Sequence, residues 1–126
     1  MWKTLTAVAF GGACGAVARW GVARVMVQLW GPTFPWGTLC VNLCGGFLIG
    51  VLSLLSSQGR LTPSLQALLM TGFLGGLTTF SSFSLETMTL LQQQRWLAAG
   101  VNMVLNLSGA LLGVGVGQWL AQRLSG

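Results

Sequence analysis

Four long apolar segments, separated by short polar or proline-containing links, make up almost all of this chain. A helix that crosses the hydrocarbon core of a membrane needs about 20 apolar residues, and each segment has that length. Only 6% of the residues are charged, against about 25% in a soluble domain. The sequence therefore predicts an all-α integral membrane protein, with residues 1–126 in a single domain. We expect its four transmembrane helices at residues 4–28, 37–56, 64–91 and 96–120.

The ionisable residues are too few for most catalytic chemistry. The chain has six Lys and Arg residues, no His and a single acid, Glu86. Paired-carboxylate catalysis, proton relays and most metal sites therefore lack the side chains they need, and we do not expect an enzyme. The basic residues are scattered rather than gathered in a patch, so no nucleic-acid partner is expected. They fit contact with the anionic head groups of membrane lipids.

The basic residues also give the chain almost no preferred orientation in a membrane. Four spans place Lys3, Arg60 and Arg123 on one side, and Arg24 and Arg95 on the other. Because an excess of Lys and Arg normally marks the cytoplasmic side, three residues against two leave both orientations open. Four short spans also enclose little volume, which favours an oligomer. We therefore consider an antiparallel homodimer, with one chain in each orientation.

Glycines at four-residue spacing predict close contact between the helices. The first segment contains Gly11 and Gly15, the second contains Gly46 and Gly50, and the fourth repeats glycine at four-residue steps from Gly109. Small residues at this spacing let the backbones of membrane helices approach one another. We therefore expect the helices to pack tightly.

The third segment contains the stretch TGFLGGLTTFSSFSLE at residues 71–86, which does not resemble a lipid-facing helix. It concentrates glycines and hydroxyl side chains at a depth where no water is expected. Irregular backbone is tolerated there only where protein buries it or where it lines a polar cavity. The sequence therefore predicts that the third helix is broken mid-membrane near residues 75–79. Such a break frees backbone carbonyls, which are cation ligands, and the stretch is interpreted as the wall of a permeation path.

Two pairs of side chains in this stretch are suited to a small anion. Phe80 and Phe83 are three residues apart, so a helix places both rings on one face. The edge of a phenyl ring is positive, so two rings held edge-on stabilise an anion without formal charge. Ser81 and Ser84 form a second pair at the same spacing, and each hydroxyl can donate a hydrogen bond. The alternative is a face of small and hydroxyl residues that only packs two helices together.

Arg19, Asn42, Asn102, Asn106 and Glu86 lie within the apolar segments and need partners there. Arg19 either reaches the membrane interface with its long side chain or attracts anions at the mouth of a path. Asn42 either clamps two helices or donates from its amide to a passing anion. Asn102 and Asn106 share a helix face and are candidates to line the same path. Glu86 is expected near a mouth or beside a cation. Many neutral donors and one carboxylate together favour an anion over a cation.

The chain resembles the Fluc (CrcB) family of small fluoride channels. The resemblance covers essentially the whole chain, and its most specific motif is the last of three. The matching stretches are GGACGAVAR at residues 11–19, GTLCVN at residues 37–42 and GFLGGLTTFSSFS at residues 72–84.

This resemblance implies a dual-topology antiparallel homodimer with two fluoride pathways, located in the bacterial inner membrane. It also implies a structural sodium ion at the centre, held by backbone carbonyls that fall here on Gly75 and Thr78 of both subunits. The residues that match the family's pore positions are Arg19, Asn42, Phe80, Ser81 and Phe83.

The chain departs from the family pattern in two places. Ser82 stands where Thr is common, and Asn102 and Asn106 occupy positions whose polarity varies. The expected function is passive, fluoride-selective export that lowers cytoplasmic fluoride, along a pathway that also includes Ser84, Asn102 and Asn106.

Two other functions compete with this expectation. A proton-coupled small multidrug transporter is also a short four-span protein of dual topology, but it needs a carboxylate in its first span. Here the only carboxylate, Glu86, lies in the third segment. A non-transporting assembly subunit is compatible with the spaced glycines alone.

Overall fold

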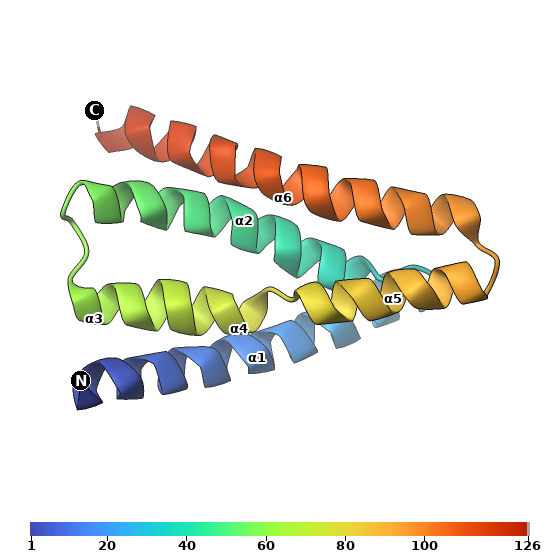
Figure 1. The fold of residues 1–126 in the computed structure, drawn as a ribbon, viewed down its shortest axis with the longest axis horizontal. Helices are drawn as coiled ribbons and strands as arrows, with labels where there is room; N and C mark the ends of the chain where they lie inside the picture. Colours follow the sequence, from blue (N-terminus) through green and yellow to red (C-terminus); the bar gives the residue numbers. More distant parts are fainter. Residues whose placement is uncertain (126) are drawn as a thin grey trace.

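Helices connected by short links form the whole described chain in the computed structural model, which describes residues 1–125 (Figure 1). The elements are α1 (Trp2–Trp30), α2 (Trp36–Ser57), α3 (Pro63–Gln66), η1 (Ala67–Leu74), α4 (Gly75–Leu77), α5 (Phe80–Gln92) and α6 (Trp96–Ser125). They make four segments long and apolar enough to cross a membrane, with bounds Trp2–Trp30, Trp36–Ser57, Pro63–Gln92 and Trp96–Ser125. The prediction of an all-helical protein with four helices of membrane-spanning length is confirmed.

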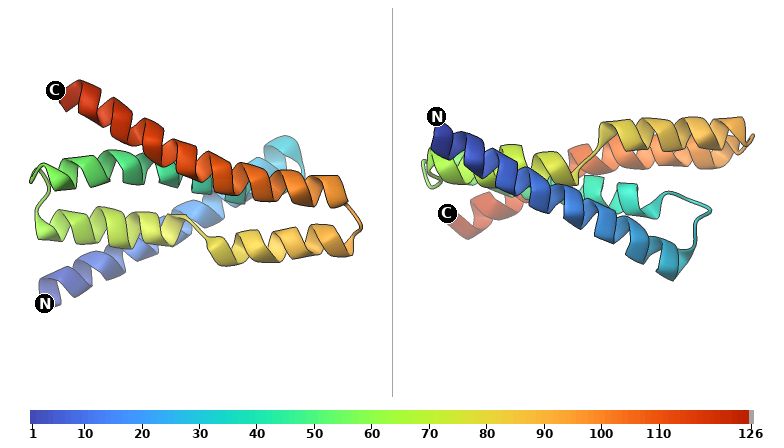
Figure 2. Two further views of the ribbon diagram at one scale, coloured as in Figure 1. Left: turned by 45° about the horizontal axis from the view of Figure 1, so that its top comes forward. Right: turned by 90° about the horizontal axis from the view of Figure 1, so that it is seen from below.

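The four segments run up and down, so successive links lie at opposite ends of the molecule (Figure 1). Both ends of the described chain and the α2–α3 link lie at one end, and the α5–α6 link lies at the other (Figure 1). Helices α2 and α6 pack along each other, and α1 packs obliquely across η1 and α4 (Figure 2). The exterior of this arrangement is largely apolar, as lipid contact requires.

Two glycine-lined seams hold the helices together. A Cβ atom added to Gly11 or Gly15 of α1 would overlap backbone carbonyl oxygens of η1. A Cβ atom on Gly46 or Gly50 of α2, or on Gly117 of α6, would overlap backbone carbonyl oxygens of the facing helix. The backbones therefore approach too closely for any side chain at these positions, and the tight packing predicted from the glycine spacing is confirmed.

The third segment starts as a regular capped helix and is then irregular. Thr62 caps the first turn, because its Oγ1 accepts a hydrogen bond from the Leu65 N–H at 3.2 Å, and Pro63 is the first helical residue. The segment widens into the π-helix η1, a form often found at functional sites. The first helical part of the segment ends with α4 at Leu77, and the backbone of Thr78 and Thr79 is extended before α5 begins.

Candidate functional site

The interruption at Thr78 and Thr79 diverts two backbone hydrogen bonds to side chains. A continuing helix would direct the Thr79 N–H to the carbonyl of Gly75 and the Ser82 N–H to the carbonyl of Thr78. Instead, the Thr79 N–H donates to Asn42 Oδ1 at 2.9 Å, and the Ser82 N–H donates to Thr79 Oγ1 at 3.1 Å. The two carbonyls expected to bind a cation are therefore the two whose helical donors are diverted.

Asn42 of α2 clamps the interruption to α6. Besides accepting from the Thr79 N–H, its Nδ2 donates to the Thr79 carbonyl at 3.1 Å and to Asn106 Oδ1 at 2.8 Å. Both amide protons are thus used within the chain. Of the two roles left open by the sequence, the geometry realises the helix clamp.

The amide contacts continue from Asn106 along the buried side of α6. Asn106 Nδ2 donates to the Asn102 carbonyl and to Asn102 Oδ1, at 2.9 and 3.0 Å. Asn102 Nδ2 donates to Thr87 Oγ1 at 2.9 Å, and the Thr87 hydroxyl donates to the Phe83 carbonyl at 2.8 Å. Asn102 is 0% exposed and Asn106 is 4% exposed, so these groups meet each other rather than solvent or lipid.

The two phenylalanines lie together at the start of α5, as their spacing predicts. Their ring centroids are 5.5 Å apart, and the ring planes are inclined at 57°. Phe83 is 6% exposed, whereas Phe80 is 71% exposed. The neighbouring serines lie on the exposed side: Ser84 Oγ donates to the Phe80 carbonyl at 2.9 Å, and Ser81 Oγ lies 3.4 Å from Thr79 Oγ1.

A hollow of about 540 Å³ collects most of the candidate residues on one surface of the chain. Its remaining wall is mainly aliphatic, from α2, η1 and α6. The candidate site residues in its lining are Asn42, Gly75, Thr78, Phe80, Phe83 and Asn106. The candidates outside its lining are Arg19, Ser81, Ser84 and Asn102.

Arg19 of α1 approaches the interruption from its other side. Its Nε donates to the Gly76 carbonyl at 3.0 Å. A cation near the C-terminal end of a helix is favourable because the unpaired carbonyls there carry partial negative charge. The half-buried Arg19 therefore stabilises the end of α4, a partner that the sequence did not reveal.

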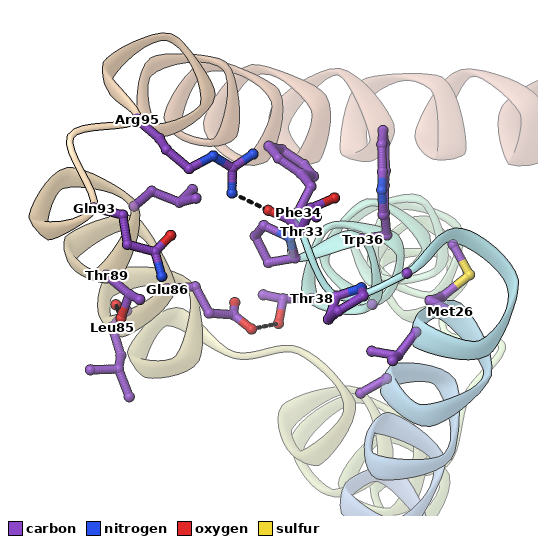
Figure 3. Close-up of a pocket in the computed structure, with 17 residues that line it drawn as sticks. Met26, Thr33, Phe34, Trp36, Thr38, Leu85, Glu86, Thr89, Gln93 and Arg95 are labelled. Atoms are coloured by element: carbon purple, nitrogen blue, oxygen red, sulfur yellow. Dashed lines mark hydrogen bonds between the residues drawn. The ribbon is translucent and has the colours of Figure 1, made fainter.

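A second hollow, also about 540 Å³, lies at the end of the molecule that holds the α1–α2 and α5–α6 links (Figure 3). Glu86 lines it and accepts a hydrogen bond from Thr38 Oγ1 at 3.0 Å through its Oε2. Glu86 Oε1 is buried and has no hydrogen-bond partner within residues 1–125. Across the hollow, an Arg95 Nη1 donates to the Thr33 carbonyl. Glu86 therefore lies toward the end of the molecule and does not line the hollow beside the interruption.

Sequence reasoning did not identify Thr38 and Thr87 as members of these networks. A spacing signal existed for Thr38, which lies four residues before Asn42 and therefore on the same face of α2. Thr87 carried a weaker signal, because it lies four residues after Phe83. Neither spacing says which polar group will face the residue across the helix interface.

The fold and these sites define a multi-pass α-helical membrane protein with an interrupted third segment and uncharged polar groups packed around the interruption. Residues 6–118 match the family described as CrcB-like protein, Camphor Resistance (CrcB), and the chain belongs to this family.

Curated relatives align over nearly the whole chain. A protein of Shewanella baltica (strain OS185), named fluoride-specific ion channel FluC, is 50% identical over 118 residues, covering 94% of this chain and 95% of that protein. Proteins of the same name from Shewanella sp. (strain ANA-3) and Shewanella oneidensis are 49% and 48% identical, with the same coverage.

Proposed function

We propose that this protein is a fluoride-selective channel that passively exports fluoride and lowers its cytoplasmic concentration. The proposal rests mainly on sequence identity: about half of the aligned residues, over almost the full length, are identical to those of proteins named fluoride-specific ion channel. A passive channel also needs no proton-carrying side chains, which agrees with a sequence that has one acid and no His. A proton-coupled transporter is not favoured, since the first span has no carboxylate.

We propose that the working unit is a homodimer that covers the hollow beside the interruption. This hollow places Asn42, Thr78, Thr79 and Asn106 in a wall whose other side chains are aliphatic or phenyl. Phe80 extends from it with 71% of its surface exposed. Polar groups and irregular backbone facing lipid are unfavourable, so a second protein surface is a better neighbour than lipid. A second copy with the same hollow supplies that surface and encloses the paired rings.

The two copies are antiparallel in this proposal, in the inner membrane of a bacterium. Support comes from the basic residues: Lys3, Arg60 and Arg123 belong to the end that holds both chain ends, and Arg24 and Arg95 to the other. Three against two gives little orientation bias. We place the interruption near the membrane centre, where an antiparallel pair brings the two interruptions to the same depth.

A sodium ion at this centre fits the backbone around the interruption. The carbonyls of Gly75 and Thr78 have had their helical donors diverted, and the Thr78 carbonyl accepts no hydrogen bond within residues 1–125. Unwound carbonyls at the ends of discontinuous helices are typical sodium ligands in membrane proteins. Two copies would contribute four such oxygens, and the ion would be structural.

The fluoride pathway in this proposal follows the surface that carries the ring edges and the polar groups beside them. Fluoride holds its water tightly, so hydrogen-bond donors and positive ring edges must replace that water along the way. The proposed pathway residues on this surface are Asn42, Phe80, Ser81, Phe83, Ser84 and Asn106. Arg19 and Asn102, also expected on the pathway, do not line the hollow beside the interruption and support it through their hydrogen bonds to Gly76 and Asn106. The N-terminal end of α5 adds a partial positive charge at this point.

The test is fluoride release from liposomes that contain the purified protein and potassium fluoride. With valinomycin present, the channel should release fluoride at a rate that an imposed pH gradient does not change, and chloride-loaded liposomes should release little. Release that depends on the pH gradient would support a coupled transporter. No release from any preparation of the assembled protein would support a non-transporting subunit.

A further inference from the structure

We propose that Asn102 and Thr87 are positioning residues. Through a series of hydrogen bonds that all run in one direction, the donor chain, they fix the position of the Thr79 peptide group and of the Phe83 backbone. This inference rests on the proposed fluoride channel and replaces direct ion contact as the role of Asn102. The chain is defined by its donors, in the order Thr79 N–H, Asn42 Nδ2, Asn106 Nδ2, Asn102 Nδ2 and Thr87 Oγ1.

The two ends of this donor chain fix the direction of every group between them. The first member is a backbone N–H, which can only donate, and the last acceptor is the Phe83 carbonyl, which can only accept. A flip of the Asn102 amide would place its NH₂ group against the NH₂ group of Asn106 and its oxygen against Thr87 Oγ1. Each amide therefore has one satisfactory orientation, set by its neighbours.

Because these groups are buried, the side chains of the donor chain depend on one another for their hydrogen bonds. Asn102 is 0% exposed and Thr87 is 7% exposed, and neither lines either of the two hollows. A buried polar group that loses its partner is strongly disfavoured. Loss of the Thr87 hydroxyl therefore frees Asn102 to rotate, which weakens its hold on Asn106 and, through Asn106, on Asn42. The consequence reaches the interruption although Thr87 does not line the hollow beside it.

The experiment compares two substitutions at Thr87 in full-length channels recorded in planar bilayers. Thr87→Val keeps the side-chain shape but removes the hydroxyl, whereas Thr87→Ser keeps the hydroxyl. Thr87→Val should lower the fluoride current of a single channel by about tenfold, the factor typical of one unmet buried hydrogen-bonding group. Thr87→Ser should stay within about twofold of the wild type.

The matched control is Thr6→Val in α1. The Thr6 hydroxyl makes the same kind of bond, to the carbonyl four residues before it at 2.8 Å, but it is exposed and lies outside the donor chain. Its single-channel current should equal that of the wild type. The single-channel current separates positioning from stability, because a variant that is only less stable yields fewer channels of normal current.

A wild-type single-channel current in Thr87→Val, or an equal loss in Thr87→Ser, would overturn the inference. If Thr87→Val does not assemble, Thr87→Ala takes its place, because it also removes the hydroxyl. A wild-type current in that variant would equally overturn it. The proposed function fails separately, if the wild-type protein itself carries no fluoride current.

Discussion

Replacing Asn42 by Asp tests whether the clamp at the interruption is required for fluoride flux. The change keeps the oxygen that accepts from the Thr79 N–H but removes both N–H donors of the amide. In the wild type, Asn42 Nδ2 lies 3.1 Å from the Thr79 carbonyl oxygen and 2.8 Å from Asn106 Oδ1. In the variant, both of these acceptors face an oxygen instead of a donor. A buried acceptor without a donor costs about 1–3 kcal/mol, and these two acceptors are partly buried. Two such acceptors cost at most about 2–6 kcal/mol before any charge is counted, and 2 kcal/mol lowers the population of the clamped conformation roughly 30-fold.

We therefore expect Asn42→Asp to lower fluoride release from liposomes by roughly 30-fold. Release is measured with a fluoride electrode at equal amounts of reconstituted protein, and size-exclusion chromatography checks that the variant assembles like the wild type. The control is Gln122→Glu, which makes the same amide-to-acid change at an exposed position near the end of α6. Release within twofold of wild type in an assembled Asn42→Asp protein would refute the reasoning.

Three further predictions follow from the proposed channel. Phe80→Ile and Phe83→Ile keep apolar volume but remove the positive ring edge, so liposome release should fall at least about tenfold with assembly intact; near-wild-type release in both would mean that the rings only pack. Exhaustive exchange of sodium for a large organic cation should inactivate the channel slowly, and undiminished release afterwards would reject a structural sodium ion. Two lysines added after Ser125, or in the loop at residues 31–33, should each fix one orientation and abolish release alone. Co-expression of both should restore release, whereas release from either single-orientation variant would exclude the antiparallel dimer.

The helices could be predicted from the sequence because their signals are local. Apolar length defined four segments, and glycine spacing predicted close contact between the helices. Each of these signals follows from residues within a few positions of one another. Together they determine the fold class and place most of the candidate residues on the segments where the structure has them.

The partners of the polar residues could not be predicted, because they are set by contacts between helices. Asn42 and Asn106 are 64 positions apart, and Arg19 and Gly76 are 57 apart. Periodicity tells which face of a helix a residue occupies, but not the depth or rotation at which two helices meet. The sequence therefore left Asn42 with two roles and Arg19 with two others. For the same reason the widening of the helix at Ala67–Leu74 had no local signal.

The interruption of the third segment offers a physical reason why a channel for an anion needs so few charged side chains. Where α4 stops, its last carbonyls carry partial negative charge, and Arg19 already donates to one of them. Where α5 starts, its first N–H groups carry partial positive charge beside the phenyl rings. One broken helix thus provides cation-binding and anion-binding ends within a few residues. In the proposed antiparallel pair the carbonyl ends of the two copies meet at one cation, whereas the positive end in each copy lies beside its own fluoride pathway. The single acid of the chain then needs no place on the route beside the rings, and Glu86 lies instead at the hollow near the end of the molecule.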